Sequence, residues 1–364
     1  MPETSTVITV DGSPLSPASL ELVQDVTIEE ALGAQDKASL TVAMLTSDRS
    51  AWTSPLDPLV APAVPFTVSI DRGGDEYRLE GRSVSASWRF APGGLSTLTV
   101  EGLDRSVELD RTHVQKVWQH RSDADIAREI LETGHGLATR IDATTSGPDP
   151  DTYSPQQSDT DWRFLRSLAD RNGFDVHLES VGGVATVVFG RVDPLAAPQT
   201  ALALGYGDLG GAASATVQLL AGQEVHVTRS IPGSTDTDVA SDTGTGHAMG
   251  SRSLGGATLV RIHAAVTAAA TDAATLATAT AERSAFGATL EATLTAPTMP
   301  LVRARRTLTV AGLGEALDGL WLVRSVRHTI TAGGHTQALG LTRNALGSSS
   351  AAGGAAGLAQ AVGL

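Results

Sequence analysis

The most constraining feature of this chain is one 17-residue segment, Ser158–Phe174, which reads SDTDWRFLRSLADRNGF. At about 100° per residue, its apolar side chains fall on one arc of a helix and most of its charged side chains on the opposite arc. Ser158 or Thr160 can cap the start, because a side-chain oxygen there accepts a hydrogen bond from an otherwise unpaired amide. Gly173 can end the helix, because glycine enters the left-handed conformation at little cost. The segment therefore predicts a short amphipathic helix over residues 161–172.

The composition limits what the rest of the chain can be. Its 364 residues are enough for two or three domains, and 41% hydrophobic residues can build a core. Aromatic residues are only 4%, so this core must consist mainly of Val, Leu, Ile and Ala. There is no cysteine, which excludes disulfides, thiolate zinc sites and a cysteine nucleophile. We expect no secretory signal at the N-terminus and no membrane span, since no apolar run approaches 18 residues.

The net charge of −14 at pH 7 bears on possible partners. Nucleic acid and anionic lipid both attract basic surfaces, so an acidic chain is poorly suited to either. We therefore expect no nucleic-acid partner and no membrane partner.

The first 105 residues have the pattern of antiparallel β-structure. Phe66, Val68 and Ile70 alternate with polar residues up to the turn at Asp71–Gly74. Short alternating strands separated by turn residues are typical of a barrel or a sandwich. Residues 1–105 are therefore predicted to form a first tube-like β-barrel.

Two further regions and a tail follow. Residues 106–200 are predicted to be a mixed α+β domain that holds the helix at 161–172 and an earlier helix at 123–133. Residues 201–345 are predicted to form a second β-barrel with an inserted helix at about 264–286. Residues 346–364 are Gly, Ala and Ser with a few apolar positions, a composition that predicts a flexible tail. The expected fold class is mainly β, with two antiparallel β-barrels flanking a mixed α/β domain.

Two segments of the chain resemble each other. Arg82–Leu103 and Arg324–Leu341 both begin with Arg-Ser-Val, continue through a Gly-Gly turn and return as a strand ending in Gly-Leu. Gly-Gly hairpins are common, so chance similarity is one interpretation. The other interpretation is a duplicated β-domain on either side of the mixed region. Two similar barrels per chain would present six similar units around the axis of a trimer.

The helical segment also resembles the signature of the late control D family, the baseplate hub proteins of contractile phage tails and related injection systems. The hub region of type VI secretion spike proteins carries a similar segment. The residues of the resemblance are Asp161, Trp162, Phe164, Leu165, Leu168, Ala169 and Gly173. A second match is similar to the family's closing strand, at Gly319, Trp321, Val323, Val326 and His328. Leu320 lies between the glycine and the aromatic residue, a departure that could shift the strand register. A weaker third match is Leu204–Leu209.

The resemblance implies a fold and a set of partners. Hubs of this family are trimers with two tube-like β-barrels per subunit, and they join a hexameric inner tube to a trimeric spike. It implies a homotrimer that contacts the inner tube protein, a separate spike protein and other baseplate components. A central chamber would hold tape-measure protein or cargo. The protein would be assembled in the bacterial cytoplasm and become part of the baseplate of a phage tail or a contractile injection particle.

Patterns that would carry catalytic chemistry are weak. Gly205–Gly210 fits G-x-G-x-x-G, but a dinucleotide site needs a helix next, and residues 215–220 are not clear helix formers. A nicotinamide-dependent enzyme using Gly205–Gly210 is one alternative function, and a glycan-binding β-protein is another. The preferred interpretation is a structural protein that is not an enzyme and has no cofactor and no catalytic residues.

Metal sites are not expected either. The pair His113 and His120 and the pair His328 and His335 each lack a third ligand for zinc. The aspartates within 149–161 do not have the spacing of a calcium loop. The densest basic cluster is Arg303, Arg305 and Arg306. Either a salt-bridged barrel surface or an acidic partner would explain these arginines.

Overall fold

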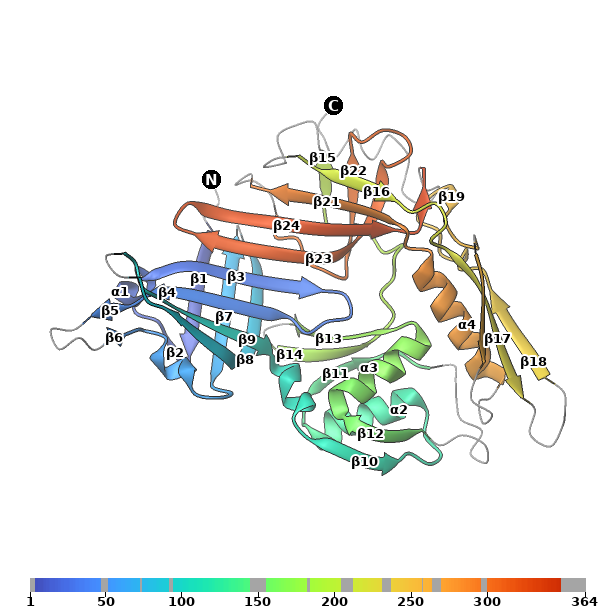
Figure 1. Ribbon diagram of the computed structural model, residues 1–364, viewed down its shortest axis with the longest axis horizontal. Helices are drawn as coiled ribbons and strands as arrows, with labels where there is room; N and C mark the ends of the chain where they lie inside the picture. The colour runs from blue at the N-terminus through green and yellow to red at the C-terminus, as the bar shows by residue number, and fades with distance from the viewer. Residues whose placement is uncertain are drawn as a thin grey trace.

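The computed structural model describes most of the chain, and the fold within it is mostly β-strand with few helices (Figure 1). The described residues are 4–46, 52–72, 74–91, 94–144, 155–181, 184–203, 212–230, 237–256, 258–263, 270–295 and 300–347. No helix within these ranges has the length and apolar character needed to cross a membrane. The predicted fold class, mainly β with a mixed middle, is confirmed.

One large sheet dominates the described part of the chain, where thirteen strands belong to it. Its N-terminal half contains β1 (Thr4–Val10), β2 (Ser13–Pro14), β3 (Val23–Ala31), β4 (Lys37–Ala43), β7 (Pro65–Arg72), β8 (Asp75–Arg89) and β9 (Thr97–Asp104). Its C-terminal half contains β15 (Ala201–Ala203), β16 (Ser214–Val217), β21 (Ala288–Leu294), β22 (Thr307–Ala311), β23 (Gly319–Thr331) and β24 (Gly334–Arg343). The halves join where β3 pairs with β23, so the two β-regions share one continuous sheet.

The strand order repeats between the two halves. The N-terminal half runs β1-β7-β8-β9-β4-β3, and the C-terminal half runs β15-β22-β23-β24-β21-β16. Corresponding strands also occur in the same order along the chain, β1, β3, β4, β7, β8, β9 in the first half and β15, β16, β21, β22, β23, β24 in the second. The two halves differ in that β1 and β7 are antiparallel, whereas β15 and β22 are parallel.

The two similar hairpins occupy equivalent places in this repeat. In β8–β9, Ser83 pairs with Gly102; in β23–β24, Ser325 pairs with Gly340. A β-bulge lies next to each serine, after it in β8 and before it in β23. The sequence similarity therefore has a counterpart in strand pairing.

The middle of the chain packs helices against a small sheet below the large one (Figure 1). After the 3₁₀ helix η2 (Arg105–Asp110) come β10 (His113–Val117), α2 (Asp123–Arg128), the π-helix η3 (Glu129–Gly134), β11 (Ala138–Ile141), β12 (Gln156–Thr160), α3 (Asp161–Asn172), β13 (Asp175–Val181) and β14 (Val184–Gly190). Strands β11, β14 and β13 form a three-stranded sheet, and β10 pairs with β12. Apolar side chains from both helices and this sheet form one core cluster.

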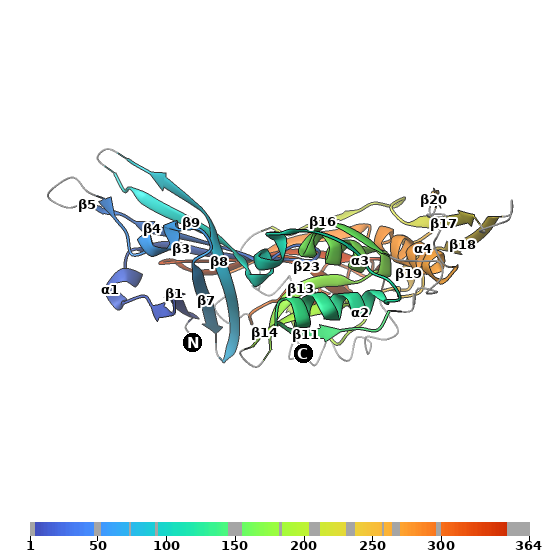
Figure 2. The same cartoon turned by 90° about the horizontal axis from the view of Figure 1, so that it is seen from below.

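A separate three-stranded sheet lies at the far end of the molecule and packs on one helix (Figures 1 and 2). It consists of β17 (Gln223–Ser230), β18 (Thr237–Asp242) and β20 (Thr258–His263), and its partner is α4 (Ala270–Ser284). Alanines of α4 face valines of β17, which permits close packing without aromatic residues. The sequence predicts the inserted helix over about 264–286; its described part is 270–284, and residues 264–269 lie outside the described ranges.

Several short elements complete the described chain. They are α1 (Pro17–Leu20), β5 (Leu45–Thr46), β6 (Trp52–Thr53), η1 (Asp57–Val60), β19 (Arg252–Ser253) and β25 (Ala345–Leu346). Most of the tail predicted over 346–364 lies outside the described ranges.

Candidate functional site

The amphipathic helix α3 begins and ends where the sequence predicts. The Thr160 hydroxyl accepts a hydrogen bond from the Arg163 amide at 3.4 Å, so Thr160 is the N-cap, while Ser158 lies in β12. Gly173 has a φ of +68°, the left-handed conformation that closes a helix. The apolar arc is buried in the middle core through Trp162, Phe164, Leu165, Leu168 and Ala169.

Polar side chains tie both ends of α3 to its neighbours. At the start, Asp161 Oδ2 lies 2.8 Å from His135 Nε2. At the end, Asn172 Nδ2 donates to Asp123 Oδ2 at 2.6 Å, and Arg171 pairs with the same carboxylate. Asp123 is the first residue of α2 and is buried. Arg171, which the sequence places on the exposed arc of α3, therefore connects the two helices.

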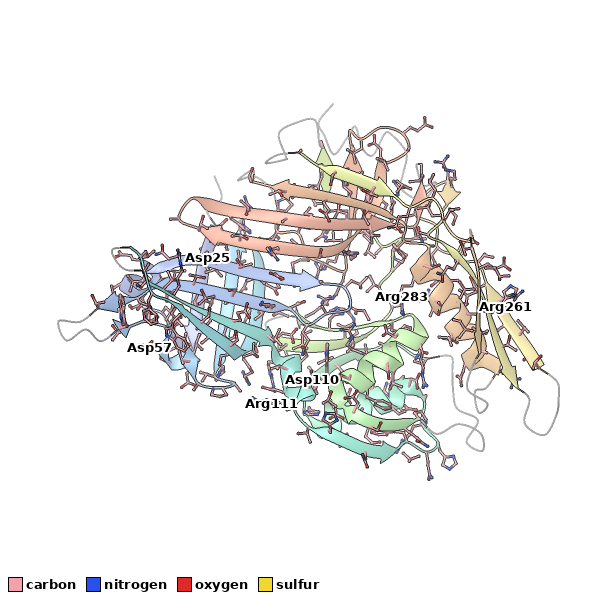
Figure 3. All side chains as sticks on the ribbon, in the orientation of Figure 1. Asp25, Asp57, Asp110, Arg111, Arg261 and Arg283 are labelled. Carbon is pink, nitrogen blue, oxygen red and sulfur yellow. The ribbon has the colours of Figure 1, made fainter. Side chains whose placement is uncertain are left out.

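Gly173 also allows α3 to approach α4. A Cβ atom on Gly173 would lie 3.2 Å from Ala279 Cβ of α4, which is tighter than an ordinary contact. Arg283, between α4 and the middle region in Figure 3, donates to the Asp170 backbone oxygen at 2.7 Å. The glycine that ends the helix therefore also lies at a contact between the middle and C-terminal parts of the chain.

The closing strand β23 keeps its signature residues on one face by means of a bulge. Trp321 and Val323 are buried, and after the bulge at Arg324 the buried positions become Val326 and His328. Successive side chains of a strand point to opposite faces. Without the extra residue, the even-numbered Val326 and His328 would therefore face away from the odd-numbered Trp321 and Val323. Gly319 starts the strand with a φ of +124°. The expected irregularity in register is therefore present, at Arg324 rather than at Leu320, which is itself buried.

His328 belongs to a buried cluster between the two β-regions. Its Nδ1 lies 3.2 Å from His335 Nε2, and its ring stacks on Tyr77 of β8 at 6.0 Å between centroids. Burial lowers the pKa of both histidines to about 3, the guanidinium of Arg303 acts in the same direction on His328, and that of Arg72 does so on both. Both rings are therefore neutral near pH 7. Within the described ranges no group of three or more metal-ligating side chains occurs, so this pair has no third ligand there.

The most concentrated electrostatic site lies where the three parts of the chain meet, and Arg305 is its centre. Its Nη2 lies 2.9 Å from Asp36 Oδ1, and its Nε lies 3.1 Å from Asp175 Oδ2. The same Nη2 donates to the backbone oxygens of Ala31 and Ala34 at 2.7 and 3.0 Å. Asp36 follows β3, Asp175 begins β13 and Arg305 precedes β22, so one guanidinium contacts all three parts.

The backbone and the charge of Arg305 both indicate a specialised position. Its φ is +64°, an uncommon conformation for a residue other than glycine, and its side chain is 4% exposed. Burial opposes the charge, but the carboxylates of Asp36 and Asp175 outweigh burial and raise the pKa of the guanidinium. Arg305 is therefore permanently charged, and its carboxylate partners are part of the fold.

Arg303 makes a second ion pair at the same junction. Its Nε lies 2.7 Å from Glu30 Oε1, and its guanidinium stacks on Tyr77 at 4.0 Å. Glu30 is buried and also accepts from the Ala304 amide at 3.1 Å. The sequence predicts either a salt-bridged surface or a site for an acidic partner at this arginine cluster. The salt bridges are present, but Arg303 and Arg305 lie in a loop and form a largely buried network.

His177 extends this network along β13. Its two ring nitrogens lie 3.0 Å from Asp175 Oδ2 and 3.3 Å from Glu179 Oε1. Burial alone would lower the pKa of His177, but the two carboxylates raise it above its ordinary value. In return, the hydrogen bond with His177 lowers the pKa of Glu179 to about 2.

The face of the large sheet opposite the cores is polar across the joint between β3 and β23. Glu29 pairs with Arg327 at 2.9 Å, Lys37 with Glu101 at 2.6 Å, and the hydroxyls of Thr41 and Thr99 lie 3.1 Å apart. Further small or charged side chains on this face are Thr27, Ser39, Thr289, Glu291, Thr293, Ser325, Thr329 and Thr336. The sheet therefore presents one continuous hydrophilic surface over both β-regions.

Two strand edges of this surface have no partner among the described residues. The first half of β8 pairs with β7, but Ser85–Arg89 pairs with β9 alone. At the other end of the surface, β16 pairs with β21 alone. Unpaired edges are ready to accept a strand from another chain. The G-x-G-x-x-G segment at 205–210, the weaker family match at 204–209 and residues 145–154 of the acidic stretch lie outside the described ranges.

Solved structures with the same fold include two tail proteins and a type VI secretion component. The 43 kDa tail protein of prophage MuSo2 from Shewanella oneidensis superposes with a TM-score of 0.69 at 16% identity, covering 94% of this chain and 100% of that one. The tail protein from Neisseria meningitidis MC58 gives 0.64 at 14%, covering 94% and 97%. The E. coli c3393 protein, a component of the type VI secretion system with structural similarity to the T4 tail proteins gp27 and gp5, gives 0.56 at 12%, covering 88% and 73%.

These identities are low enough that the likeness establishes the fold alone. A comparison with the sequences of curated proteins finds no match. The family assignment comes from a sequence model, the phage tail baseplate hub (GPD), which matches residues 39–334. That range includes α3, the β8–β9 hairpin, the whole of β23 and both junction arginines, Arg303 and Arg305. The chain therefore belongs to the phage tail baseplate hub family, as the resemblance of its helix and closing strand indicated.

Proposed function

We propose that this hub protein is a non-enzymatic adapter that assembles as a homotrimer between the inner tube and a separate spike. The observation that carries the proposal is the repeated strand order of the large sheet. The joint between β3 and β23 connects the last strand of one repeat to the long bulged strand of the next. The same strand order therefore recurs along the sheet, and the pairing pattern can be extended beyond two units.

The joint within the chain provides a template for a joint between chains. In the repeat, β16 corresponds to β3, and the second half of β8 corresponds to the part of β23 that β3 pairs with. These are the two edges left unpaired. If β16 of one copy pairs with Ser85–Arg89 of the next, three copies place six similar units in a ring. Closing the sheet removes its exposed edges, which otherwise promote aggregation.

The polar face gives the ring an interior. On closure it would line a central chamber with threonine, serine and paired charges, a surface that offers few apolar contacts to a passing chain. We propose that tape-measure protein or cargo occupies this chamber. Six similar units suit a hexameric tube on one side, and threefold symmetry suits a spike on the other.

The assembly would form in the bacterial cytoplasm and become part of the baseplate of a tail or injection particle. The tail proteins with the same fold support this setting by analogy. The buried charges of the Arg305 junction support a structural role, because each is paired within the fold.

The test begins with the mass of the purified chain, alone and with the neighbouring spike and tube proteins. The chain has no cysteine, so any disulfide that forms must join the introduced cysteines. Ser87→Cys in β8 is combined in turn with cysteine at each position of 214–217 in β16. We expect oxidation to yield covalent trimers for the positions that lie opposite residue 87 in the assembly.

A matched control combines Ser87→Cys with Ser13→Cys in β2, which lies at another edge of the large sheet. This pair should remain monomeric on a denaturing gel. A chain that stays monomeric in the presence of both tube and spike, or that gives no trimer with any cysteine in 214–217, refutes the proposed arrangement.

A further inference from the structure

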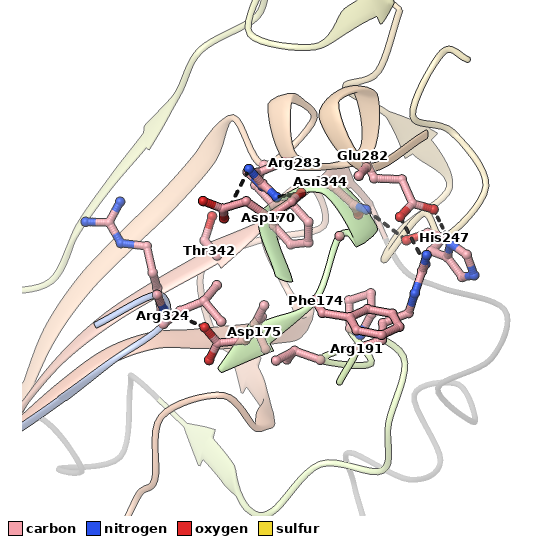
Figure 4. Close-up of a pocket in the computed structure, with 18 of the residues that line it drawn as sticks. Asp170, Phe174, Asp175, Arg191, His247, Glu282, Arg283, Arg324, Thr342 and Asn344 are labelled. Carbon is pink, nitrogen blue, oxygen red and sulfur yellow. Dashed lines mark hydrogen bonds and ion pairs between the residues drawn. The ribbon is translucent and has the colours of Figure 1, made fainter. Parts of the chain in front are cut away.

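A cavity of about 460 Å³ lies where the three parts of the chain meet (Figure 4). Its walls come from the loop after β3, the end of α3, the last turn of α4 and the strands β23 and β24. This volume is within the range of sites that bind small molecules or a few residues of a peptide. It is separate from the polar sheet face and from the strand edges used in the proposed assembly.

Each carboxylate on the cavity wall already has an arginine partner. Glu282 lies 3.0 Å from Arg191 and 2.6 Å from His247. Asp170 lies 3.6 Å from Arg283, and Figure 4 marks this pair with a dashed line. The third carboxylate, Asp175, is held at the buried junction by its guanidinium partner there. None of these acids is free to balance a further positive charge.

Two more arginines line the same cavity without such a partner. Among the described residues, neither Arg166 of α3 nor Arg324 of β23 forms a salt bridge. Both lie beside one loop. Arg166 Nη2 is 3.5 Å from the place where a Cβ of Gly33 would stand, and the Arg324 backbone oxygen accepts from the Leu32 amide at 2.8 Å. The cavity therefore has an excess of positive charge, although the chain as a whole carries −14.

The remaining wall is apolar and partly aromatic. Leu32, Phe174, Phe286 and Leu322 line it, and Leu322 is almost fully buried. An occupant that satisfies both kinds of wall must be anionic at one end and apolar at the other. The planar fork of an arginine matches a carboxylate, and an apolar wall favours a singly charged group over a strongly hydrated phosphate.

We propose that this cavity binds a carboxylate carried on an apolar group, held by Arg166 and Arg324 against the phenylalanines. Two sources present this chemistry, namely the C-terminal residue of a partner protein and a small organic acid. In either case the ligand connects α3 to β23 and so bridges the middle region and the large sheet. This inference does not depend on the proposed trimer.

Calorimetric titration of the full chain with N-acetyl-phenylalanine and with its amide tests the proposal. The two probes have the same apolar group, but only the first has a carboxylate. We expect the acid to bind about tenfold more tightly than the amide, the factor that one charge-assisted hydrogen bond provides. Arg166→Gln or Arg324→Gln should remove most of this difference, whereas Arg327→Gln, on the same strand outside the cavity, should preserve it.

Three outcomes overturn the proposal: equal binding of acid and amide, no binding of either, or an equal loss in the Arg327→Gln control. If a variant fails to fold, the affinity of the unmodified chain for the acid is measured at increasing salt concentration instead. Binding by two guanidiniums must weaken as the salt concentration rises. N-acetyl-Gly-Gly-Phe and 4-phenylbutyrate then distinguish the sources. Tighter binding of the peptide indicates a protein C-terminus, and tighter binding of phenylbutyrate indicates a small acid.

Discussion

Replacing Arg305 with methionine tests whether the buried junction holds the three parts of the chain together. Methionine keeps a long flexible side chain in the cavity that the arginine stem fills, but removes the guanidinium. Asp36 and Asp175 then remain buried without the cation that lies 2.9 and 3.1 Å away. The backbone oxygens of Ala31 and Ala34 also lose their donor.

The expected cost follows from these contacts. Removing one partner of a buried ion pair costs about 3–5 kcal/mol, because the remaining charge stays desolvated. Each lost donor to a carbonyl adds about 1 kcal/mol, and His177, which still lies 3.0 Å from Asp175, offsets part of the total. We therefore expect a loss of about 4 kcal/mol in the free energy of unfolding at pH 7. For a chain of this length that corresponds to a fall of roughly 5 °C in melting temperature.

The pH dependence of the loss identifies its cause. Burial already raises the pKa of Asp36 in the parent, and removing Arg305 raises it further, whereas His177 continues to lower the pKa of Asp175. A carboxyl of raised pKa favours the folded state at low pH and destabilises it as pH rises. The variant should therefore lose most stability at pH 7 and progressively less toward pH 4.

Differential scanning calorimetry across this pH range measures the effect, and hydrogen exchange locates it. The Gly33 amide donates to Asp175 Oδ1 at 3.0 Å, so its protection should fall first. Arg306→Met is the matched control, since Arg306 is the exposed neighbour of Arg305. An Arg305→Met variant that melts with the parent at pH 7, or whose deficit grows as pH falls, refutes this account of the junction.

Three further predictions use the same stability assays. Leu165→Asp places a charge on the fully buried face of α3 and should cost several kcal/mol, whereas Ser167→Asp on the exposed face of the same helix should cost little. Gly102→Ala should destabilise by about 1–3 kcal/mol, because its Cβ would lie 2.1 Å from a phenylalanine ring of the core, whereas Gly94→Ala has room; equal melting temperatures would contradict this. Glu179→Gln should cost about 1–2 kcal/mol at pH 7, after allowance for partial exposure. Because the pKa of Glu179 is lowered to about 2 from 4.5, its contribution is present above pH 4.5 and fades toward pH 2, and a pH-independent difference from the parent would disprove the pairing.

The sequence predicts α3 accurately because everything that defines it is local. Its apolar period, its N-cap Thr160 and its closing Gly173 all lie within 14 residues. The inserted helix is less sharply defined, since alanine and threonine repeat there without a strong polar face, and it is described only from Ala270. The sequence does not predict the separate sheet of β17, β18 and β20 beside it, because its strands read like those of a barrel and their core partners are alanines.

The junction could not be placed from sequence for a different reason. The partners of Arg305 lie 130 and 269 residues away, and those of Arg303 lie 273 away. No periodicity links positions at such separations. The available signal was the arginine cluster itself, which is dense for a chain with so few basic residues. The division into three domains stays a prediction, although the continuous sheet shows that the two β-regions are not independent of each other.

The two faces of the joint between β3 and β23 explain why the chain should act as one rigid unit. Glu29 and Glu30 are adjacent and point to opposite faces of the sheet, and each has its own arginine. Arg327 thus joins β3 to β23 on one face, and Arg303 joins β3 to the loop before β22 on the other. The proposed joint between chains has no equivalent, because β16 consists of Ser214–Val217 and contains no charged residue. The subunit contact should therefore be the weaker of the two, so dilution or mild denaturant should release folded monomers before the β3–β23 joint opens.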